Sequence, residues 1–192
     1  IEALRQGHIP HYRGLILRKT YPQLSDLVDK SMAYYKQAFP TAQYNATSHV
    51  WVFPSGAKIY FGSLNHAQDK YNYQGQAYDF IGFDELTHFT WEEYSYLMSR
   101  NRPSGPGTQV YIRATANPGG IGHGWVKARF ITPAPPGTRM VQLVGDDRTS
   151  SALFGMMLCI TQVLVAPLAW YAGSWIVPLE NRAQLRPLAY VA

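Results

Sequence analysis

A short apolar segment that runs directly into two neighbouring carboxylates constrains the fold of this chain more than any other feature. Residues 80–83 are apolar or glycine, and Asp84 and Glu85 follow at once. A run without polar alternation is typical of a strand covered on both faces, as in the parallel sheets of α/β proteins. Because ligands bind at the carboxyl ends of such strands, we expect the two carboxylates to lie at a functional edge of the sheet.

Two adjacent carboxylates at the end of a strand can do specific chemistry. Asp84 could help to hold a hydrated Mg²⁺ ion beside nucleotide phosphates. Glu85 could polarise an attacking water as a general base. The simpler interpretation is a strand that ends in an acidic turn or a helix cap, and the pattern taken by itself leaves that interpretation open.

A second apolar segment also ends in polar residues. Residues 109–114 read as a strand, and Thr115 and Asn117 follow before the Pro-Gly-Gly turn at 118–120. A hydroxyl and an amide at the same sheet edge as the carboxylates could bind a nucleotide, sense its γ-phosphate or position the attacking water. The alternative is a glycine-rich loop before a helix. Residues 119–124 are not a phosphate loop, because no Lys-Ser or Lys-Thr follows them.

The order of elements over residues 1–132 favours the same fold class. Short apolar runs alternate with segments whose apolar residues recur at helical spacing, which predicts an α/β domain with a mainly parallel sheet. Two of the expected strands flank a Pro-Ser-Gly turn and form a hairpin inserted into that sheet. The expected strands are residues 14–18, 49–53, 57–62, 78–83 and 109–114, and the expected helices are residues 23–39, 90–99 and 124–131.

The chain divides at a proline-rich segment. Residues 133–137 hold three prolines and a glycine, which cannot continue a helix or a central strand, and we interpret them as a linker. Residues 138–192 form an apolar tail, with no charged residue from 150 to 179. The tail could be an end foreign to the domain, a membrane-spanning segment, or an apolar segment buried on the domain. We expect the first, with a tail that takes no part in function and does not pack against the core.

Composition excludes several other classes of protein. Charged residues make up 15% of the 192 residues and the net charge is +5, which excludes a disordered polyelectrolyte and a coiled coil. The single cysteine, Cys159, excludes a disulfide framework and a cysteine-rich zinc site. The positive charge is compatible with a polyanionic partner.

Three segments together resemble a known family. Residues 15–28 (LILRKTYPQLSDLV), 80–90 (FIGFDELTHFT) and 113–131 (RATANPGGIGHGWVKARFI) are similar to the ATPase domain of large terminase subunits, the DNA-packaging motors of tailed bacteriophages. The resemblance covers roughly residues 12–136. It implies a RecA-like P-loop NTPase core that binds ATP and Mg²⁺.

The resemblance also implies roles for the candidate residues. Asp84 and Glu85 match the Walker B pair, with Asp84 as the metal ligand and both residues as catalytic. Residues 115–120, with Thr115 and Asn117 at the nucleotide, match the motif that couples hydrolysis to DNA movement. The intact motor would act on double-stranded DNA as a homo-oligomeric ring in the host cytoplasm. Its expected partners are the portal of the prohead and the small terminase subunit.

The sequence departs from the family pattern in three places. No Gly-rich loop ending in Gly-Lys-Ser or Gly-Lys-Thr precedes the strand at 14–18, and residues 133–192 lack the acidic cluster of a nuclease domain. Gln74 stands where relatives often carry a candidate arginine finger. We therefore expect a fragment of the packaging motor that has little or no ATPase activity by itself, since no backbone cradle holds the phosphates.

Two other functions stay open from the sequence. Another RecA-like nucleic-acid translocase or helicase would share the same sheet edge, and duplex unwinding by the full-length parent would favour it. A membrane-anchored α/β binding protein would use the apolar tail as its anchor. Extraction from membranes by detergent but not by salt would favour that second alternative.

Overall fold

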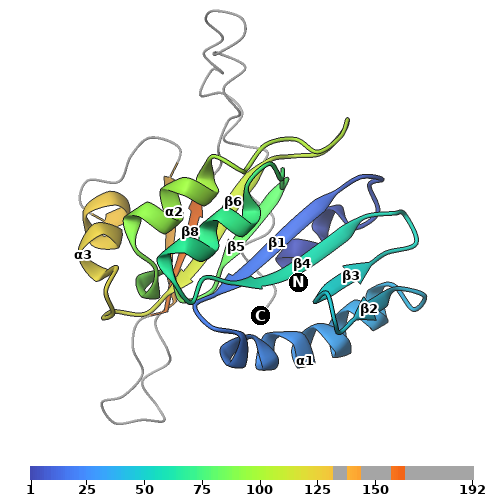
Figure 1. Ribbon diagram of the computed structural model, residues 1–192, viewed down its shortest axis with the longest axis horizontal. Coiled ribbons are helices and arrows are strands. Elements are labelled where there is room, and N and C mark those ends of the chain that lie inside the picture. The colour runs from blue at the N-terminus through green and yellow to red at the C-terminus, as the bar shows by residue number, and fades with distance from the viewer. Residues whose placement is uncertain (132–137, 144–156, 163–192) are drawn as a thin grey trace, which may run out of the picture.

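The computed structural model describes residues 1–131, 138–143 and 157–162 (Figure 1). These residues form one eight-stranded sheet with strand order β2-β3-β4-β1-β5-β6-β8-β7. The strands are β1 (Arg13–Arg18), β2 (Gln43–Asn45), β3 (Val50–Val52), β4 (Lys58–Ser63), β5 (Phe80–Phe83), β6 (Tyr111–Ala116), β7 (Thr138–Leu143) and β8 (Met157–Gln162). The helices are α1 (Tyr21–Ala38), α2 (Trp91–Met98) and α3 (His123–Val126), with short 3₁₀ segments η1 (Glu2–Gln6), η2 (Ala67–Tyr73) and η3 (Leu86–His88) and a π segment η4 (Lys127–Ile131).

The strands β4, β1, β5 and β6 run parallel to one another at the centre of the sheet. In their register, Leu17 of β1 lies beside Phe83 of β5, and Phe83 lies beside Ala114 of β6. The outer strands are antiparallel to their neighbours, so the sheet is mixed. The predicted α/β class is confirmed, whereas the RecA-like P-loop core stays a prediction.

The central strands are buried on both faces. Ile81 and Phe83 of β5 belong to one buried cluster together with Leu15 and Leu17 of β1, and residues of α2 and α3 cover that cluster. Phe80 points to the opposite face, into a second cluster that α1 and η1 cover. The three side chains of β5 are buried, and only Gly82, which has no side chain, is partly accessible, which explains the uninterrupted apolar sequence before Asp84.

Helix α1 covers the second face, and its ends follow from two prolines (Figure 1). Thr20 is the N-cap and Pro22 lies in the first turn, where a missing backbone N–H costs no hydrogen bond. The helix ends before Phe39, the residue that precedes Pro40, because that position disfavours helical backbone angles. The predicted helix at 23–39 is confirmed within two residues at each end.

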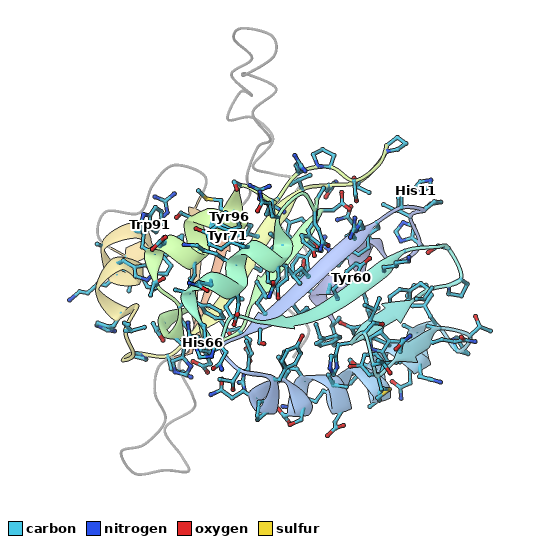
Figure 2. The ribbon with its side chains drawn as sticks, in the orientation of Figure 1. His11, Tyr60, His66, Tyr71, Trp91 and Tyr96 are labelled. Carbon is cyan, nitrogen blue, oxygen red and sulfur yellow. The ribbon has the colours of Figure 1, made fainter. Side chains whose placement is uncertain are left out.

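Segment η2 was not predicted, and it packs against α2 just ahead of β5. Figure 2 shows Tyr71 of η2 beside Tyr96 of α2, and their ring centroids lie 5.5 Å apart. The buried Lys70 forms an ion pair with Glu92 of α2, and its Nζ lies 5.2 Å from the centroid of the Tyr71 ring. These contacts hold the segment that leads into the carboxylate-bearing strand.

The predicted hairpin is present, but it is not an insertion. Strands β3 and β4 pair antiparallel around a turn that contains Gly56, whose φ of 91° favours glycine. Strand β4 also pairs in parallel with β1 along its whole length, so it is a central strand of the sheet. The buried side chains of Ile59 and Phe61 explain this position, since they belong to the cluster under α1.

Two pieces of the tail join the sheet. Strand β8 pairs antiparallel with β6, and β7 pairs antiparallel with β8, so at these two strands the expectation of an unpacked tail does not hold. The linker at 133–137 and most of the charge-free run at 150–179 lie outside the described residues. Within the part of the chain that the structure describes, no helix is long and apolar enough to cross a membrane.

Candidate nucleotide site at the sheet edge

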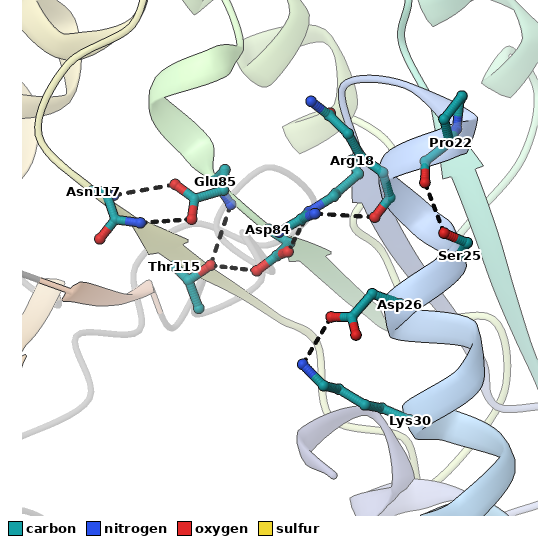
Figure 3. Close-up of polar contacts among 10 residues, drawn as sticks. Arg18, Pro22, Ser25, Asp26, Lys30, Asp84, Glu85, Thr115 and Asn117 are labelled. Atoms are coloured by element: carbon teal, nitrogen blue, oxygen red, sulfur yellow. Dashed lines mark hydrogen bonds and ion pairs between the residues drawn. The ribbon is translucent and has the colours of Figure 1, made fainter. Parts of the chain in front are cut away.

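The register of the parallel strands brings the predicted site residues together. Leu17, Phe83 and Ala114 lie side by side, so the residues that follow them, Arg18, Asp84 and Thr115, occur at the same level of neighbouring strands. Glu85 and Asn117 follow one and two residues later at this edge. Figure 3 shows these five side chains in one group, joined by hydrogen bonds and an ion pair.

The carboxylate of Asp84 is held by a donor on each oxygen. The Thr115 hydroxyl donates to Oδ1 at 2.6 Å, and Arg18 Nε donates to Oδ2 at 2.5 Å. The backbone N–H of Asp84 continues the β1–β5 ladder by donating to the Leu17 carbonyl at 2.9 Å. The Asp84 and Arg18 side chains are 22% and 24% exposed, so the carboxylate is fixed in orientation but open to a ligand.

Glu85 is held by the strand end that carries Asn117. The Asn117 side-chain amide donates to Oε1 of Glu85 at 2.7 Å, and its backbone N–H donates to Oε2 at 3.3 Å. The backbone N–H of Glu85 donates to the Thr115 hydroxyl at 3.2 Å. Because the same hydroxyl donates to Asp84, Thr115 links the two carboxylate residues into one network.

The backbone turns sharply between the strand and the next helix. Glu85 has φ 60° and ψ 60°, the left-handed region that side chains with a Cβ disfavour. The turn leads into η3, where the Thr87 hydroxyl donates to the Asn117 carbonyl at 2.9 Å. At Gly120, with φ 81°, a Cβ would lie 2.6 Å from the Thr87 carbonyl oxygen, so glycine is needed for this approach.

The family model for the N-terminal part of the T4-like terminase large subunit matches residues 1–126. The chain belongs to this terminase family. The match spans every residue of the sheet edge described above, so the terminase assignment and the geometry concern the same part of the molecule. Membership links the chain to viral DNA packaging, and hence to DNA and the packaging machinery in general. No curated protein matches the chain.

The donor set of this terminase chain suits Mg²⁺ better than a softer metal. Among the described residues, no group of three or more His, Cys, Asp or Glu side chains could hold a metal ion. Mg²⁺ is commonly held by one or two carboxylates together with waters and substrate phosphates. Each oxygen of the Asp84 carboxylate accepts one hydrogen bond, from Arg18 or from Thr115, and a carboxylate oxygen can accept a second, so the residue retains capacity for a hydrated cation.

Sequence reasoning found four members of the network and missed Arg18. The four predicted residues, Asp84, Glu85, Thr115 and Asn117, lie together as the strand ends indicated. The sequence puts Arg18 at the end of the predicted strand at 14–18 and indicates no partner for it. The place of Arg18 at a strand end is the one sequence feature that could have indicated a role at the sheet edge. Its ion pair with Asp84 depends on β1 lying next to β5, and no local sequence pattern determines that strand order.

Proposed function

We propose that this chain is the part of a viral DNA-packaging motor that completes a catalytic site for ATP hydrolysis. The observation that carries the proposal is the in-register meeting of Asp84 with Thr115 and of Glu85 with Asn117 at the carboxyl edge of parallel strands. Membership of the terminase family supports the same function. The cofactors are ATP and Mg²⁺.

In this proposal each side chain has a separate task. Asp84, oriented by Thr115, would hold hydrated Mg²⁺, which when bound offsets the negative charge of the phosphates. Glu85 would accept a proton from the water that attacks the γ-phosphorus, while the bond to the ADP oxygen breaks. Asn117 keeps the Glu85 carboxylate in place through two N–H donors, so the proton acceptor is oriented before substrate arrives.

Asn117 connects the candidate site to the neighbouring turn. Its side chain contacts Glu85 and its carbonyl accepts the Thr87 hydroxyl, so it joins β6 to the turn before α2. We infer that this connection transmits the state of the site to the surface that engages double-stranded DNA. The proposed partners are the portal of the prohead, the small terminase subunit and further copies of the motor in a ring, in the host cytoplasm.

A test needs a polypeptide in which this chain is joined to a phosphate loop, because residues 1–192 contain no Gly-Lys-Ser or Gly-Lys-Thr. In such a full-length terminase subunit, Glu85→Gln should lower the ATPase rate by about 10²- to 10⁴-fold, the usual contribution of a general base. Binding of ATP should change little, because the substitution preserves shape and removes one charge.

The matched control is Asp26→Asn, which neutralises a 63% exposed carboxylate of α1 that pairs with Lys30. This variant should keep the wild-type rate. Asp84→Asn should weaken binding of Mg²⁺–ATP as well as lower the rate. Wild-type turnover by Glu85→Gln would show that the base is another residue, and the proposed function of this edge would fail.

A further inference from the structure

The Arg18–Asp84 ion pair occupies the carboxylate that the proposed function assigns to Mg²⁺. Arg18 is the last residue of β1, and its Nε approaches Oδ2 of Asp84 to 2.5 Å. Its NH1 group donates to the Gln23 carbonyl at 3.0 Å, in the first turn of α1. The guanidinium is therefore held at two points, and it brings a full positive charge against the candidate metal ligand.

We propose that Arg18 is a positioning residue that competes with a divalent cation for Asp84. This inference rests on the proposed function, since it takes Asp84 as the metal ligand. Without the cation, Arg18 compensates the charge of Asp84 and fixes its rotamer. When the cation binds, Arg18 gives up Oδ2, while the neutral Thr115 hydroxyl keeps its bond to Oδ1.

The two donors to Asp84 differ in what they do to a cation. The Thr115 hydroxyl orients the carboxylate without adding charge. Arg18 places a unit positive charge at ion-pair distance, and two like charges on one carboxylate repel each other. Both side chains of the ion pair are only about a quarter exposed, so solvent screens this repulsion less than it would at an open surface.

The neighbouring charges on α1 do not replace Arg18. Lys30 lies on the same side of the edge, but its ammonium group pairs with the Asp26 carboxylate at 2.7 Å (Figure 3). The hydrogen bond to Asp26 raises the pKa of Lys30, so the residue stays charged and paired at neutral pH. Lys30 thus offers a matched control: a cation near the site whose hydrogen bond goes to Asp26, and which acts on Asp84 only through longer-range charge.

The experiment is an NMR titration of the isotope-labelled chain with Mn²⁺, which serves as a paramagnetic probe for the Mg²⁺ site. Binding is measured from the broadening of the backbone amide signals of Asp84, Glu85 and Thr115. Arg18→Gln keeps a neutral donor but removes the charge. It should tighten the apparent dissociation constant for Mn²⁺ by on the order of fivefold, the scale of a partly exposed ion pair. Arg18→Lys, which keeps the charge, and Lys30→Gln should both stay within about twofold of wild type.

The outcomes separate this inference from the proposed function. Loss of Mn²⁺ broadening in Asp84→Asn would show that Asp84 is a metal ligand. If, in addition, Arg18→Gln weakens Mn²⁺ binding or leaves it unchanged, Arg18 does not compete with the cation. The inference about Arg18 is then wrong, while the metal site at Asp84 stands. If Asp84→Asn leaves the broadening as in wild type, Asp84 is not the ligand and both are wrong. If Arg18→Gln and Lys30→Gln tighten Mn²⁺ binding equally, the effect comes from the net charge near the site rather than from the Arg18–Asp84 ion pair. That result would also overturn the inference.

Discussion

Glu85 combines the proposed chemical role with an unfavourable backbone conformation. Its φ and ψ of 60° place a residue with a Cβ in the left-handed region, at a cost of about 1–2 kcal/mol. The conformation turns the chain away from β5 and aims the carboxylate at Asn117, which donates to both of its oxygens. The bonds to Asn117 therefore offset part of the cost of this backbone conformation.

Two substitutions of Glu85 separate strain from side-chain bonding. Glu85→Ala and Glu85→Gly both remove the bonds to Asn117, but glycine adopts the left-handed region without the steric penalty. We expect the glycine variant to be more stable than the alanine variant by about 1 kcal/mol, measured by urea unfolding. Equal stabilities, or a more stable alanine variant, would show that the turn relaxes and stores no strain.

At the residue scale, the sequence predicted which side chains meet but not how they bond. Apolar strands that end in Asp84 and Thr115 placed both residues at one edge, because parallel strands of an α/β sheet share their carboxyl edge. The left-handed Glu85 could not be predicted, since nothing in the residue type favours it. Arg18 was missed because its partner lies on a strand distant in sequence.

Helix α2 begins at a capping box that also anchors the site edge. The Thr90 hydroxyl accepts the Glu93 N–H at 3.2 Å, and the Glu93 carboxylate accepts the Thr90 N–H at 2.9 Å. The buried Glu93 also pairs with Lys19 at 2.7 Å. Since Lys19 follows Arg18 directly, this ion pair ties the start of α2 to the end of β1.

Removing Glu93 should therefore cost more than removing an ordinary helix cap. Thr90→Ala loses one cap and should lower the free energy of unfolding by about 1 kcal/mol. Glu93→Ala also leaves Lys19 without its carboxylate and should cost about 3 kcal/mol. Chemical denaturation of both variants tests the difference, and equal losses would mean that the Lys19–Glu93 pair adds nothing to stability.

At the element scale, helix ends were predictable and strand neighbours were not. Prolines 22 and 40 and the cap at Thr90 bounded α1 and α2 closely, because capping and proline effects act within one turn. The sequence predicts β4 as part of an inserted hairpin, whereas the strand pairs with β1 along its whole length. That pairing joins residues far apart in sequence, and the buried cluster under α1 decides it.

The whole molecule relies on tyrosines for much of its core. Of its 14 tyrosines, five are buried in the two clusters on either face of the sheet, and Tyr73 packs partly buried against one of these clusters. The five are Tyr12, Tyr35, Tyr78, Tyr94 and Tyr111. Burial raises the pKa of Tyr78 to about 12. Burial also raises the pKa of the other core tyrosines above its ordinary value, namely Tyr12, Tyr35, Tyr73, Tyr94 and Tyr111.

These raised pKa values predict a fold that fails in alkali. Below about pH 10, tyrosine is protonated in both the folded and the unfolded chain, so the full stability is present. Above that pH the unfolded chain loses protons that the folded chain keeps, and the free energy of unfolding falls by up to about 1.4 kcal/mol per pH unit for each buried tyrosine. The fall continues until the pH passes the folded-state pKa values, of which that of Tyr78 is about 12.

The domain has six tyrosines whose pKa is raised in this way. If its stability is ordinary, it should unfold cooperatively within about two pH units above pH 10. Tyrosinate absorbance should rise in the same transition. Tyr35→Phe is the matched variant, because burial raises the pKa of Tyr35 and the substitution removes only the titrating hydroxyl. It should leave the pH 8 to 9 plateau in place but reduce the alkaline slope by about 1.4 kcal/mol per pH unit. Tyrosinate absorbance that rises well below the unfolding transition would show that the tyrosines ionise in the folded chain, and the argument from burial would be wrong.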